Sequence, residues 1–248
     1  MTHKVKCADC PLRGLEHFAP FSAEELEVTQ RFKAGELTID PQKTILREGA
    51  KAAQLYTVLS GMGVRYKTLS NGRRQVINFI FPGDFIGLQG SVMEEMQQSV
   101  ESTTDMLFCV FDRASLWQFI KASPERSFDL TWAAAVDEHL VAEALTTVGQ
   151  QTAESRIAWA LVRLSERAER VGLSSGPDET PLPFRQQDLA DAMGLSLVHT
   201  NKTLRRLLER GYARWSDGVL TVTDRRGLRA AAGLAVDDET MPTRRPLI

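Results

Sequence analysis

The chain has 248 residues, of which 43% are hydrophobic and 25% charged, with a formal net charge of −2. This composition is ordinary for one or two globular domains. No apolar run approaches the ~20 residues that a bilayer-spanning helix needs, and the N-terminus carries no apolar signal segment, so we expect a cytoplasmic protein without membrane contact. The three cysteines are an odd number, which argues against a disulfide framework in a reducing compartment.

The N-terminal segment, residues 1–20, holds Cys7 and Cys10 and shows little periodic structure. Ser22 is a good N-cap for a short helix, and Glu24 and Glu25 follow in the first turn, where acidic side chains interact favourably with the helix dipole. We therefore expect the first helix to begin just after Ser22.

Residues 21–123 are expected to form a β-rich domain. Short runs rich in Val, Ile, Phe and Tyr are separated by glycines, which is typical of strands joined by turns. Asn71-Gly72 predicts a tight hairpin, and Pro82-Gly83-Asp84 predicts a further turn. The expected strands are Leu37–Ile39, Leu55–Ser60, Val64–Leu69, Gln75–Phe81 and Met106–Phe111. Many short strands of this kind indicate a small antiparallel barrel or roll.

Two helices are expected next, over Ala114–Ala122 and from Pro124 to about Val148. The second carries an apolar stripe at spacings of three and four residues, interrupted by Asp137. Such a stripe is either ordinary core or the seam of a helix pair. We expect residues 124–150 to form a dimerisation helix, with its seam at Leu130, Ala134, Val141, Leu145 and Val148.

Residues 151–235 are expected to form a second domain. A helix over Ala153–Val171 and a loop over Gly172–Glu179 precede two short amphipathic helices, which lie either side of Gly194. Gly194 can adopt a positive φ at little cost and Ser196 can cap the second helix, so the pair is predicted to be a helix-turn-helix. An αα-hairpin with a charged surface is the alternative.

The periodicity of these two helices predicts which side chains face inward. In the first helix the inner face is expected at Leu189, Ala192 and Met193. In the second the inner stripe is expected at Leu197, Leu204, Leu207 and Leu208, and the outer face at Val198, His199, Asn201, Lys202, Arg205 and Arg206. Ala213–Trp215 and Val219–Val222 flank Ser216-Asp217-Gly218, which predicts a β-hairpin wing. Residues 236–248 are expected to be a disordered tail.

Charge is unevenly distributed along the chain. From Ser196 to Ala232 there are eight basic and three acidic residues, a local balance of +5, so the remainder carries about −7. A basic patch on an otherwise acidic protein fits a DNA contact confined to one domain.

Taken in order, these features resemble the Crp/Fnr family of bacterial transcription regulators. The resemblance covers about residues 7–232 and rests on Gly49, on the runs from Leu55 to Gly61 and from Pro82 to Gly87, and on the segment Asp188–Leu208. It implies an α+β protein with an N-terminal antiparallel, jelly-roll-like β-roll as sensor domain, a long dimerisation helix and a C-terminal winged helix-turn-helix. It also implies a homodimer that binds double-stranded DNA at a palindromic operator and contacts RNA polymerase.

The resemblance places the base contacts of the recognition helix at Leu197, Val198, Asn201 and Lys202. The Fnr branch has Glu, Ser and Arg at the last three of these positions, so the Fnr-type operator is not expected here. Lys202 can donate to guanine and Asn201 can pair with adenine, whereas basic side chains farther along more often meet phosphates. The residues expected at the DNA are Ser196, Leu197, Val198, His199, Asn201, Lys202, Arg205, Arg206 and Arg214.

Three interpretations compete for the signal, and the first is a cyclic nucleotide. The Crp branch binds the cyclic phosphate through a Glu after a glycine-containing turn and through an Arg-Ser pair. Here Leu88-Gln89 follow Gly87, and the later region is Met96-Gln97-Gln98-Ser99. Because a buried phosphate would lack its arginine partner, we expect no response to cAMP.

The second interpretation is an iron–sulfur cluster, which would make the protein responsive to oxygen or redox state. The Fnr branch holds a 4Fe-4S cluster with three N-terminal cysteines and one cysteine in the roll. Cys7, Cys10 and Cys109 match three of these positions, and the remaining one falls on Glu16. The resemblance therefore makes these four residues candidate ligands. Against it, Cys109 on an apolar strand is also typical of a small core residue.

The third interpretation is zinc or no metal. His3, Cys7, Cys10 and His17 could supply a zinc site with two cysteines and two histidines. Without a metal, the signal would be a different ligand, a thiol redox switch or no small molecule, and in each case we expect it to act in the roll and be relayed through the long helix.

Two other classes of protein were weighed. No segment matches a Walker loop, a GxSxG elbow or an HExxH helix, so we expect no enzymatic activity. A signalling scaffold that keeps the fold without binding DNA is the main alternative, and the local balance of +5 argues against it.

Overall fold

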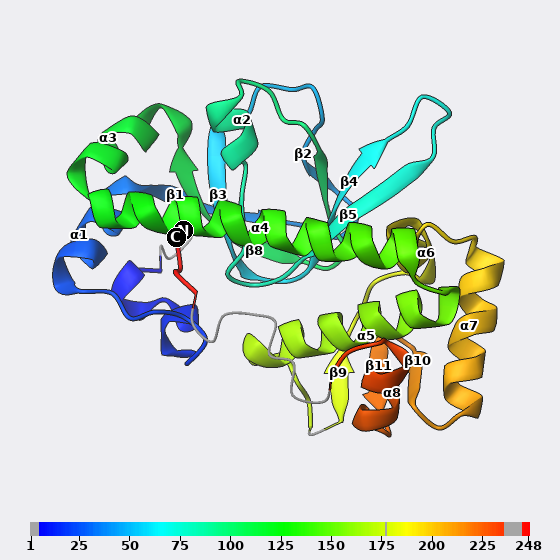
Figure 1. Cartoon of the computed structure of the whole chain (residues 1–248). Helices are drawn as coiled ribbons and strands as arrows, with labels where there is room; N and C mark the ends of the chain where they lie inside the picture. The colour runs from blue at the N-terminus through cyan, green and yellow to red at the C-terminus, as the bar shows by residue number, and fades with distance from the viewer. Residues whose placement is uncertain (1–4, 177, 236–244) are drawn as a thin grey trace. The chain divides into compact units, whose positions relative to one another are not determined.

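The computed structural model describes residues 5–176, 178–235 and 245–248 (Figure 1). The chain forms two compact units. Unit 1 comprises Met1–Lys67, Ile80–Glu138 and Thr243–Ile248, and unit 2 comprises Thr68–Phe79 and His139–Pro242. The segment Thr68–Phe79, expected with the roll, therefore groups with the C-terminal half of the chain.

Two antiparallel sheets build the β-roll of unit 1. The first has the order β1 (Lys33–Ile39), β8 (Met106–Asp112), β3 (Gln54–Ser60) and β6 (Phe85–Ile86). In the second, β2 (Thr44–Leu46), β7 (Ser99–Ser102) and β4 (Gly63–Thr68) pair in that order. Apolar side chains from both sheets share one core, including Leu46, Val58, Ile86, Val100 and Phe108. The expected α+β fold with an antiparallel roll is confirmed.

Three strands of the roll had not been expected. β2, β6 and β7 have only three, two and four residues, too few for an alternating apolar pattern to stand out. In β7 two of the buried positions are Ser99 and Ser102. The hydroxyl of Ser102 donates to the carbonyl oxygen of Asp40 at 2.7 Å, so this strand is held partly by polar contacts that a hydrophobic pattern does not reveal.

The helices of unit 1 begin with α1 (Ala23–Phe32), which starts after Ser22 as expected. The Ser22 hydroxyl accepts from the backbone N–H of Glu25 at 3.2 Å, and the Glu25 carboxylate accepts from the N–H of Ser22 at 2.6 Å, a capping box. α2 (Leu88–Val92) and α3 (Leu116–Ala122) follow. Phe32 of α1 stacks on Phe111 and Phe119 at 4.8 and 4.5 Å between ring centroids, which fixes α1 against β8 and α3.

α4 (Pro124–Gln150) is the long helix expected from the sequence. The division between the two units falls within it, after Glu138. Asp137, which interrupts the apolar stripe, accepts from the Arg65 guanidinium at 2.9 Å. The acidic residue in the stripe is therefore explained by an ion pair with β4.

The expected dimer seam on α4 needs one correction. Leu130 is 6% exposed, and because it is already buried within one chain, it offers no surface to a second one. Ala134, Val141 and Leu145 are exposed, Leu145 at 71%, whereas Val148 is half-buried. The open part of the seam therefore lies at Ala134 and beyond.

The expected disordered tail also needs a correction. Residues 236–244 lie outside the described residues, but Arg245–Ile248 pack against unit 1, and we call this segment the 245–248 clasp. The carbonyl of Arg245 accepts from the N–H of Ala19 at 2.9 Å, and its guanidinium lies 3.3 Å from the Asp84 carboxylate. The last two residues are 4% and 5% exposed. The prediction of a disordered tail rested on the composition of the whole segment, and the two apolar residues Leu247 and Ile248 were too few to change it.

Buried donors of unit 1 bind the clasp. The Thr57 hydroxyl donates to the carbonyl of Ile248, and the Arg126 guanidinium donates to the carbonyl of Leu247. Arg126 is 1% exposed, pairs with Asp129 at 2.6 Å and lies over the ring of Phe21 at 4.2 Å. The clasp thus supplies one of the acceptors that a buried guanidinium needs.

Unit 2 is built on α5 (Ala153–Arg170), whose cap Thr152 accepts from the N–H of Ser155 at 3.2 Å. The remaining elements are α6 (Gln186–Met193), α7 (Leu197–Glu209), α8 (Arg225–Ala231) and a sheet of order β10 (Ala213–Ser216), β11 (Val219–Val222) and β9 (Glu179–Pro181). The helix pair and the wing hairpin are where they were expected, whereas β9 and α8 had not been expected.

β5 (Arg74–Ile80) belongs mostly to unit 2, together with the turn that precedes it. Gly72, at a φ of +79°, donates to the carbonyl of Leu69 at 2.9 Å, which confirms the tight turn predicted at Asn71-Gly72. Among the described helices, none combines the length and the apolarity needed to cross a lipid bilayer.

Candidate functional site

α6, a sharp turn and α7 form the centre of the site. Gly194 ends α6 in the left-handed region, with a φ of +65°, and the N–H of Leu195 donates to the carbonyl of Ala190 at 3.0 Å. A residue with a β-carbon would be strained at this φ. Ser196 then caps α7, its hydroxyl accepting from the N–H of His199 at 3.2 Å. Both predictions for this turn are confirmed.

A buried carboxylate stabilises the start of α6, the first helix of the pair. Asp188 is 1% exposed, and it accepts from the guanidinium of Arg185 at 2.6 and 3.0 Å and from the N–H of Arg185 at 3.1 Å. Leu189, Ala192 and Met193 face inward as expected, each at most 7% exposed. The start of α6 is therefore held by an ion pair that the apolar pattern did not indicate.

The inner face of α7 differs from the one expected. Thr200, Thr203 and Leu207 are fully buried, while Leu197 is 39% and Leu208 is 49% exposed. The buried positions are spaced by three and four residues, which places them on one helix face. Placing all four leucines inside was wrong for Leu197 and Leu208, because Thr200 and Thr203 take the buried positions. The Thr203 hydroxyl donates to the carbonyl of His199 at 2.9 Å.

This rotation leaves the expected reading residues on the surface. Figure 1 shows α7 at the outer edge of unit 2, with α5 and the wing to one side of it. Val198 is 79% exposed. Ser196, Leu197, His199, Asn201, Lys202, Arg205, Arg206 and Arg214 are exposed as well. The face is thus polar and basic with an apolar N-terminal end, which suits contact with the edges of bases and with phosphates.

Two of the basic side chains are already oriented by neighbours. Arg205 lies 3.1 Å from Glu209 on the same helix, with both side chains largely exposed. The Nε of Arg214, on the wing, donates to the hydroxyl of Ser216 at 3.1 Å. The wing itself is fixed by Trp215, whose indole N–H donates to the carbonyl of Leu182 at 3.0 Å.

The basic patch is smaller than the sequence suggested. Arg210 pairs with Glu154, Arg225 with Glu169 at 2.5 Å, and Arg229 with Glu166. These three glutamates lie on α5, outside the segment from Ser196 to Ala232. Including them lowers the net charge of this region from +5 to +2. Three of the eight basic residues therefore pack α7 and α8 against α5, and a fourth, Arg205, is paired with Glu209. The open positive charge is carried by Lys202, Arg206, Arg214 and Arg226.

The three cysteines meet in unit 1. Cys7, Cys10 and Cys109 line one cavity of about 30 Å³, together with Lys33 and the end of the clasp. Burial raises the pKa of the Cys109 thiol to about 12 and also raises the pKa of Cys7. Lys33 is almost fully buried and donates to the Glu36 carboxylate at 2.6 Å. The three cysteines therefore line one cavity, and burial favours the protonated thiol at Cys7 and Cys109.

The residues of this cavity do not fit an iron–sulfur cluster. Glu16, the candidate fourth ligand, is exposed and does not line the cavity. The space is about that of one water molecule, and Leu247 and Ile248 occupy one wall. In the described residues no group of three or more His, Cys, Asp or Glu side chains is placed to hold a metal ion. Cys7, Cys10 and His17, which the zinc interpretation named, therefore do not form such a group. His3 lies outside the described residues.

Comparison with known proteins defines the class. The family model "Cyclic nucleotide-binding domain" matches residues 36–123, and "Crp-like helix-turn-helix domain" matches residues 155–231. A β-roll of the sensor type followed by a winged helix-turn-helix is the architecture of a transcription regulator. The chain belongs to the Crp/Fnr family of these regulators.

Several curated relatives align along most of the chain. The transcriptional activator protein FnrL of Cereibacter sphaeroides is 28% identical over 227 residues, covering 89% of this chain and 86% of the relative. The transcriptional activatory protein AadR of Rhodopseudomonas palustris is 29% identical over 202 residues, covering 80% and 81%. Among solved structures, FixK2 of Bradyrhizobium japonicum superposes with a TM-score of 0.73 at 24% identity, covering 81% of this chain and 98% of that one, which supports the fold.

Proposed function

We propose that this transcription regulator binds a two-fold symmetric DNA operator as a homodimer, with α7 of each copy in the major groove. The observation that carries the proposal is the orientation of α7. Its buried face is Thr200, Thr203 and Leu207, so Asn201 and Lys202 project from the opposite side. The Lys202 ammonium can donate to guanine O6 and N7, and the Asn201 amide can pair with adenine.

The remaining basic residues of the site position the helix on the duplex. Arg206 of α7 and Arg214 of the wing are exposed, and contacts of such side chains with phosphates orient a protein without reading its sequence. Val198, 79% exposed near the start of α7, offers an apolar contact for a thymine methyl group. This combination of charges and apolar surface differs from the Glu, Ser and Arg of the Fnr branch and supports a different operator.

Dimerisation is proposed through α4. Ala134, Val141 and Leu145 form an exposed apolar row on this helix, and a row of this kind is stabilised when a second helix covers it. The dimer would carry two copies of α7 to successive major grooves, whose spacing is about 34 Å. Contact with RNA polymerase and a location in the cytoplasm follow from this function and are part of the proposal.

The signal is proposed to be other than cAMP. Ser99 lies in the region where the Crp branch has its Arg-Ser pair. Here its hydroxyl already has a partner within the chain, because it accepts from the N–H of Glu48 at 3.0 Å. Gln97 and Gln98 precede it where a phosphate would require an arginine. The cysteine cavity does not fit a cluster, so no oxygen response is derived from it.

Selection from random DNA tests the proposal. The full chain is mixed with a pool of random duplexes, bound duplexes are sequenced, and the mass of the free protein is measured by sedimentation. We expect an enriched inverted repeat with half-sites about 10 base pairs apart and a dimeric mass. The Lys202→Ala variant should change the enriched base, whereas Lys121→Ala, an exposed lysine of α3 in unit 1, should not.

The same experiment separates the alternative function. A scaffold that keeps the fold without binding DNA would enrich no motif, and its binding would not depend on Lys202. That outcome, obtained with a folded dimer, would overturn the proposed function.

A further inference from the structure

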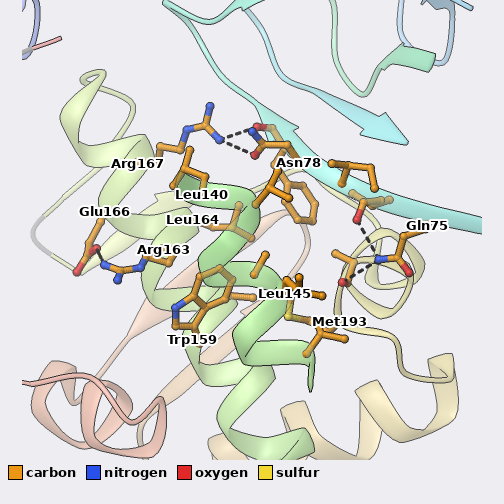
Figure 2. A pocket seen from close by; sticks show the side chains of 18 of the residues that line it. Gln75, Asn78, Leu140, Leu145, Trp159, Arg163, Leu164, Glu166, Arg167 and Met193 are labelled. Carbon is orange, nitrogen blue, oxygen red and sulfur yellow. Dashed lines mark hydrogen bonds and ion pairs between the residues drawn. The ribbon is translucent and has the colours of Figure 1, made fainter. Parts of the chain in front are cut away.

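An apolar pocket of unit 2 lies between α4, α5 and β5 (Figure 2), and Val141 and Leu145 of α4 line it. These two residues belong to the row through which dimerisation is proposed. The pocket is therefore assigned to the interface with a second copy of the chain.

A different surface, in unit 1, is the one that the 245–248 clasp covers. We call its residues the clasp site. They come from the segment before α1, from β3, from the turn before β6 and from the start of α4. The clasp site consists of His17, Phe18, Ala19, Thr57, Gly83, Asp84 and Arg126, all of which contact the clasp. The positions of these residues run from 17 to 126, so the first half of the chain supplies the whole site and the clasp joins it from the other end.

The clasp binds to this site as an extended strand. Phe18 and Arg245 form a parallel β-bridge. The N–H of Ala19 donates to the carbonyl of Arg245, and the N–H of Arg245 donates to the carbonyl of His17, both at 2.9 Å. Adding a strand to an exposed backbone edge is one of the recurring ways in which proteins recognise peptides.

Two buried side chains bind the backbone of the clasp farther along. Thr57 donates to the carbonyl of Ile248 and Arg126 to the carbonyl of Leu247, and both donors are 1% exposed. Arg126 is held independently of the clasp by its ion pair with Asp129 at 2.6 Å. Because these bonds use only main-chain oxygens of the clasp, any extended segment could accept them.

A buried carboxylate selects arginine. Asp84 is 7% exposed and lies 3.3 Å from the Arg245 guanidinium, which also donates to the carbonyl of Gly83 at 3.4 Å. The other carboxylate oxygen of Asp84 accepts from the N–H of Phe81 at 2.9 Å, and its carbonyl accepts from the N–H of Val58 at 2.9 Å. Asp84 is therefore positioned by unit 1 itself. A guanidinium reaches the carboxylate and the neighbouring carbonyl together, which suits arginine better than lysine.

The last part of the site selects aliphatic side chains. Leu247 and Ile248 are 4% and 5% exposed, and they line the cysteine cavity together with Leu59 and Phe111. Only about 30 Å³ of this cavity remains beside them. The two side chains thus fill an apolar space that polar residues would not fill favourably.

We propose that the clasp site is a peptide-binding site, which recognises an extended segment of a partner protein with arginine at the position of Arg245 and aliphatic residues two and three positions later. The clasp is its internal occupant and shows the chemistry that the site takes. A segment joined to its site by a short linker competes at an effective concentration in the millimolar range. A partner segment must therefore displace the clasp.

Displacement would also release a tether between the two units. The ten peptide units from Ala235 to Arg245 span at most about 35 Å. A bound clasp limits the distance between the end of unit 2 and the clasp site to this length, and a partner bound in its place removes the limit. An effect on operator binding would follow, and this consequence rests on the proposed function.

Fluorescence anisotropy with a labelled peptide of residues 243–248, Thr-Arg-Arg-Pro-Leu-Ile, tests the proposal. It is mixed with the full chain carrying Leu247→Ser and Ile248→Ser, which empties the clasp site and leaves its own residues unchanged. We expect saturable binding to this clasp variant and at least tenfold weaker binding to the unaltered chain, where the internal occupant competes. A peptide with alanine at the position of Arg245 should bind at least tenfold more weakly, because it lacks the guanidinium that pairs with Asp84.

Substitutions in the clasp site identify it as the place of binding. Asp84→Asn, made in the clasp variant, should weaken peptide binding about tenfold and remove the preference for arginine over alanine. Thr57→Val removes one buried donor and should weaken both peptides alike. Asp105→Asn is the matched control, since Asp105 is an exposed aspartate of unit 1 that is not part of the clasp site, and it should leave binding unchanged.

Thermal unfolding gives a second measurement. The clasp variant should unfold at a lower temperature than the unaltered chain, and saturating peptide should raise its midpoint again, because a ligand that binds only the folded state stabilises it. Circular dichroism checks that the clasp variant is folded. Arg245→Ala, which keeps both aliphatic residues, opens the site by a smaller change and carries both measurements if the double variant does not fold.

Three results would overturn the proposal. The first is absence of peptide binding to a folded variant with an open clasp. The second is binding that neither Asp84→Asn nor the alanine peptide changes, since it would not occur at this site. The third is recovery of stability only with a second full chain that has an intact clasp, which would show exchange between copies. Operator binding is measured on the same samples, so failure of the peptide site alone leaves the proposed DNA-binding function standing.

Discussion

The orientation of α7 can be tested with two adjacent leucines. Leu207 is fully buried where α7 packs against α5, α6 and β10, and Leu208 is 49% exposed. Leu207→Ala removes a completely buried side chain and leaves a cavity, which should lower the free energy of unfolding of unit 2 by about 3 kcal/mol. Leu208→Ala removes a half-exposed side chain and leaves no cavity, so its cost should stay under about 1 kcal/mol.

The two variants form a matched pair because both replace leucine by alanine on the same helix, so the change in helix propensity cancels. Hydrogen exchange of the α7 amides measures the local cost, and denaturant unfolding of the full chain measures the total. We expect Leu207→Ala to speed exchange of the α7 amides well beyond Leu208→Ala, with operator affinity retained in both at low temperature. Equal losses, or a larger loss for Leu208→Ala, would refute the rotation that presents Asn201 and Lys202 to DNA.

Other predictions follow from the same structure. Lys202→Ala should cost about 1–3 kcal/mol of operator affinity and relax the preference at one base pair per half-site. Arg206→Ala should weaken binding to all sequences and reduce the slope of log affinity against log salt concentration by about one unit. Gel shifts across salt concentrations measure both effects, and an unchanged slope would remove Arg206 from the interface. Because burial raises the pKa of Cys109 to about 12, this thiol stabilises the fold below its unfolded pKa of about 8.5 and loses that contribution as the pH rises toward the folded value. The stability of the chain relative to Cys109→Ala should therefore fall over this range, and a constant difference in denaturant unfolding would contradict the assigned burial. Arg245→Ala leaves the buried Asp84 without its guanidinium partner and should destabilise unit 1 by about 3 kcal/mol; an unchanged unfolding midpoint would mean that the clasp does not hold.

The architecture could be predicted from the sequence where local signals agree. Gly194 and Ser196 have one favourable role each, as the left-handed end of one helix and the cap of the next, and both roles are found. Asn71-Gly72 and the Ser22 cap are similar cases. These features depend on the residue type and its immediate neighbours, which the sequence contains in full.

The parts that could not be predicted depend on partners far away in the chain. Arg210 and Arg225 belong to the basic stretch, but their glutamates lie on α5, so charge counted in a window overestimates the open patch. The inner face of α7 was misjudged because leucine is more apolar than threonine, while the packing around α7 buries Thr200 and Thr203.

The 245–248 clasp has a consequence for the order of folding. Unit 1 contains residues from both ends of the described chain, and Thr57 meets Ile248 across 191 positions of sequence. During synthesis the strands of the roll emerge first, and Asp129 can pair with Arg126 early, but the second acceptor of this buried guanidinium, the carbonyl of Leu247, arrives only after unit 2 has been made. Contacts between residues this far apart in the sequence form late, because the entropy cost of closing a long loop comes before the contact energy is gained. The N-terminal roll is therefore expected to form first without one wall of its cysteine cavity, which Leu247 and Ile248 complete later.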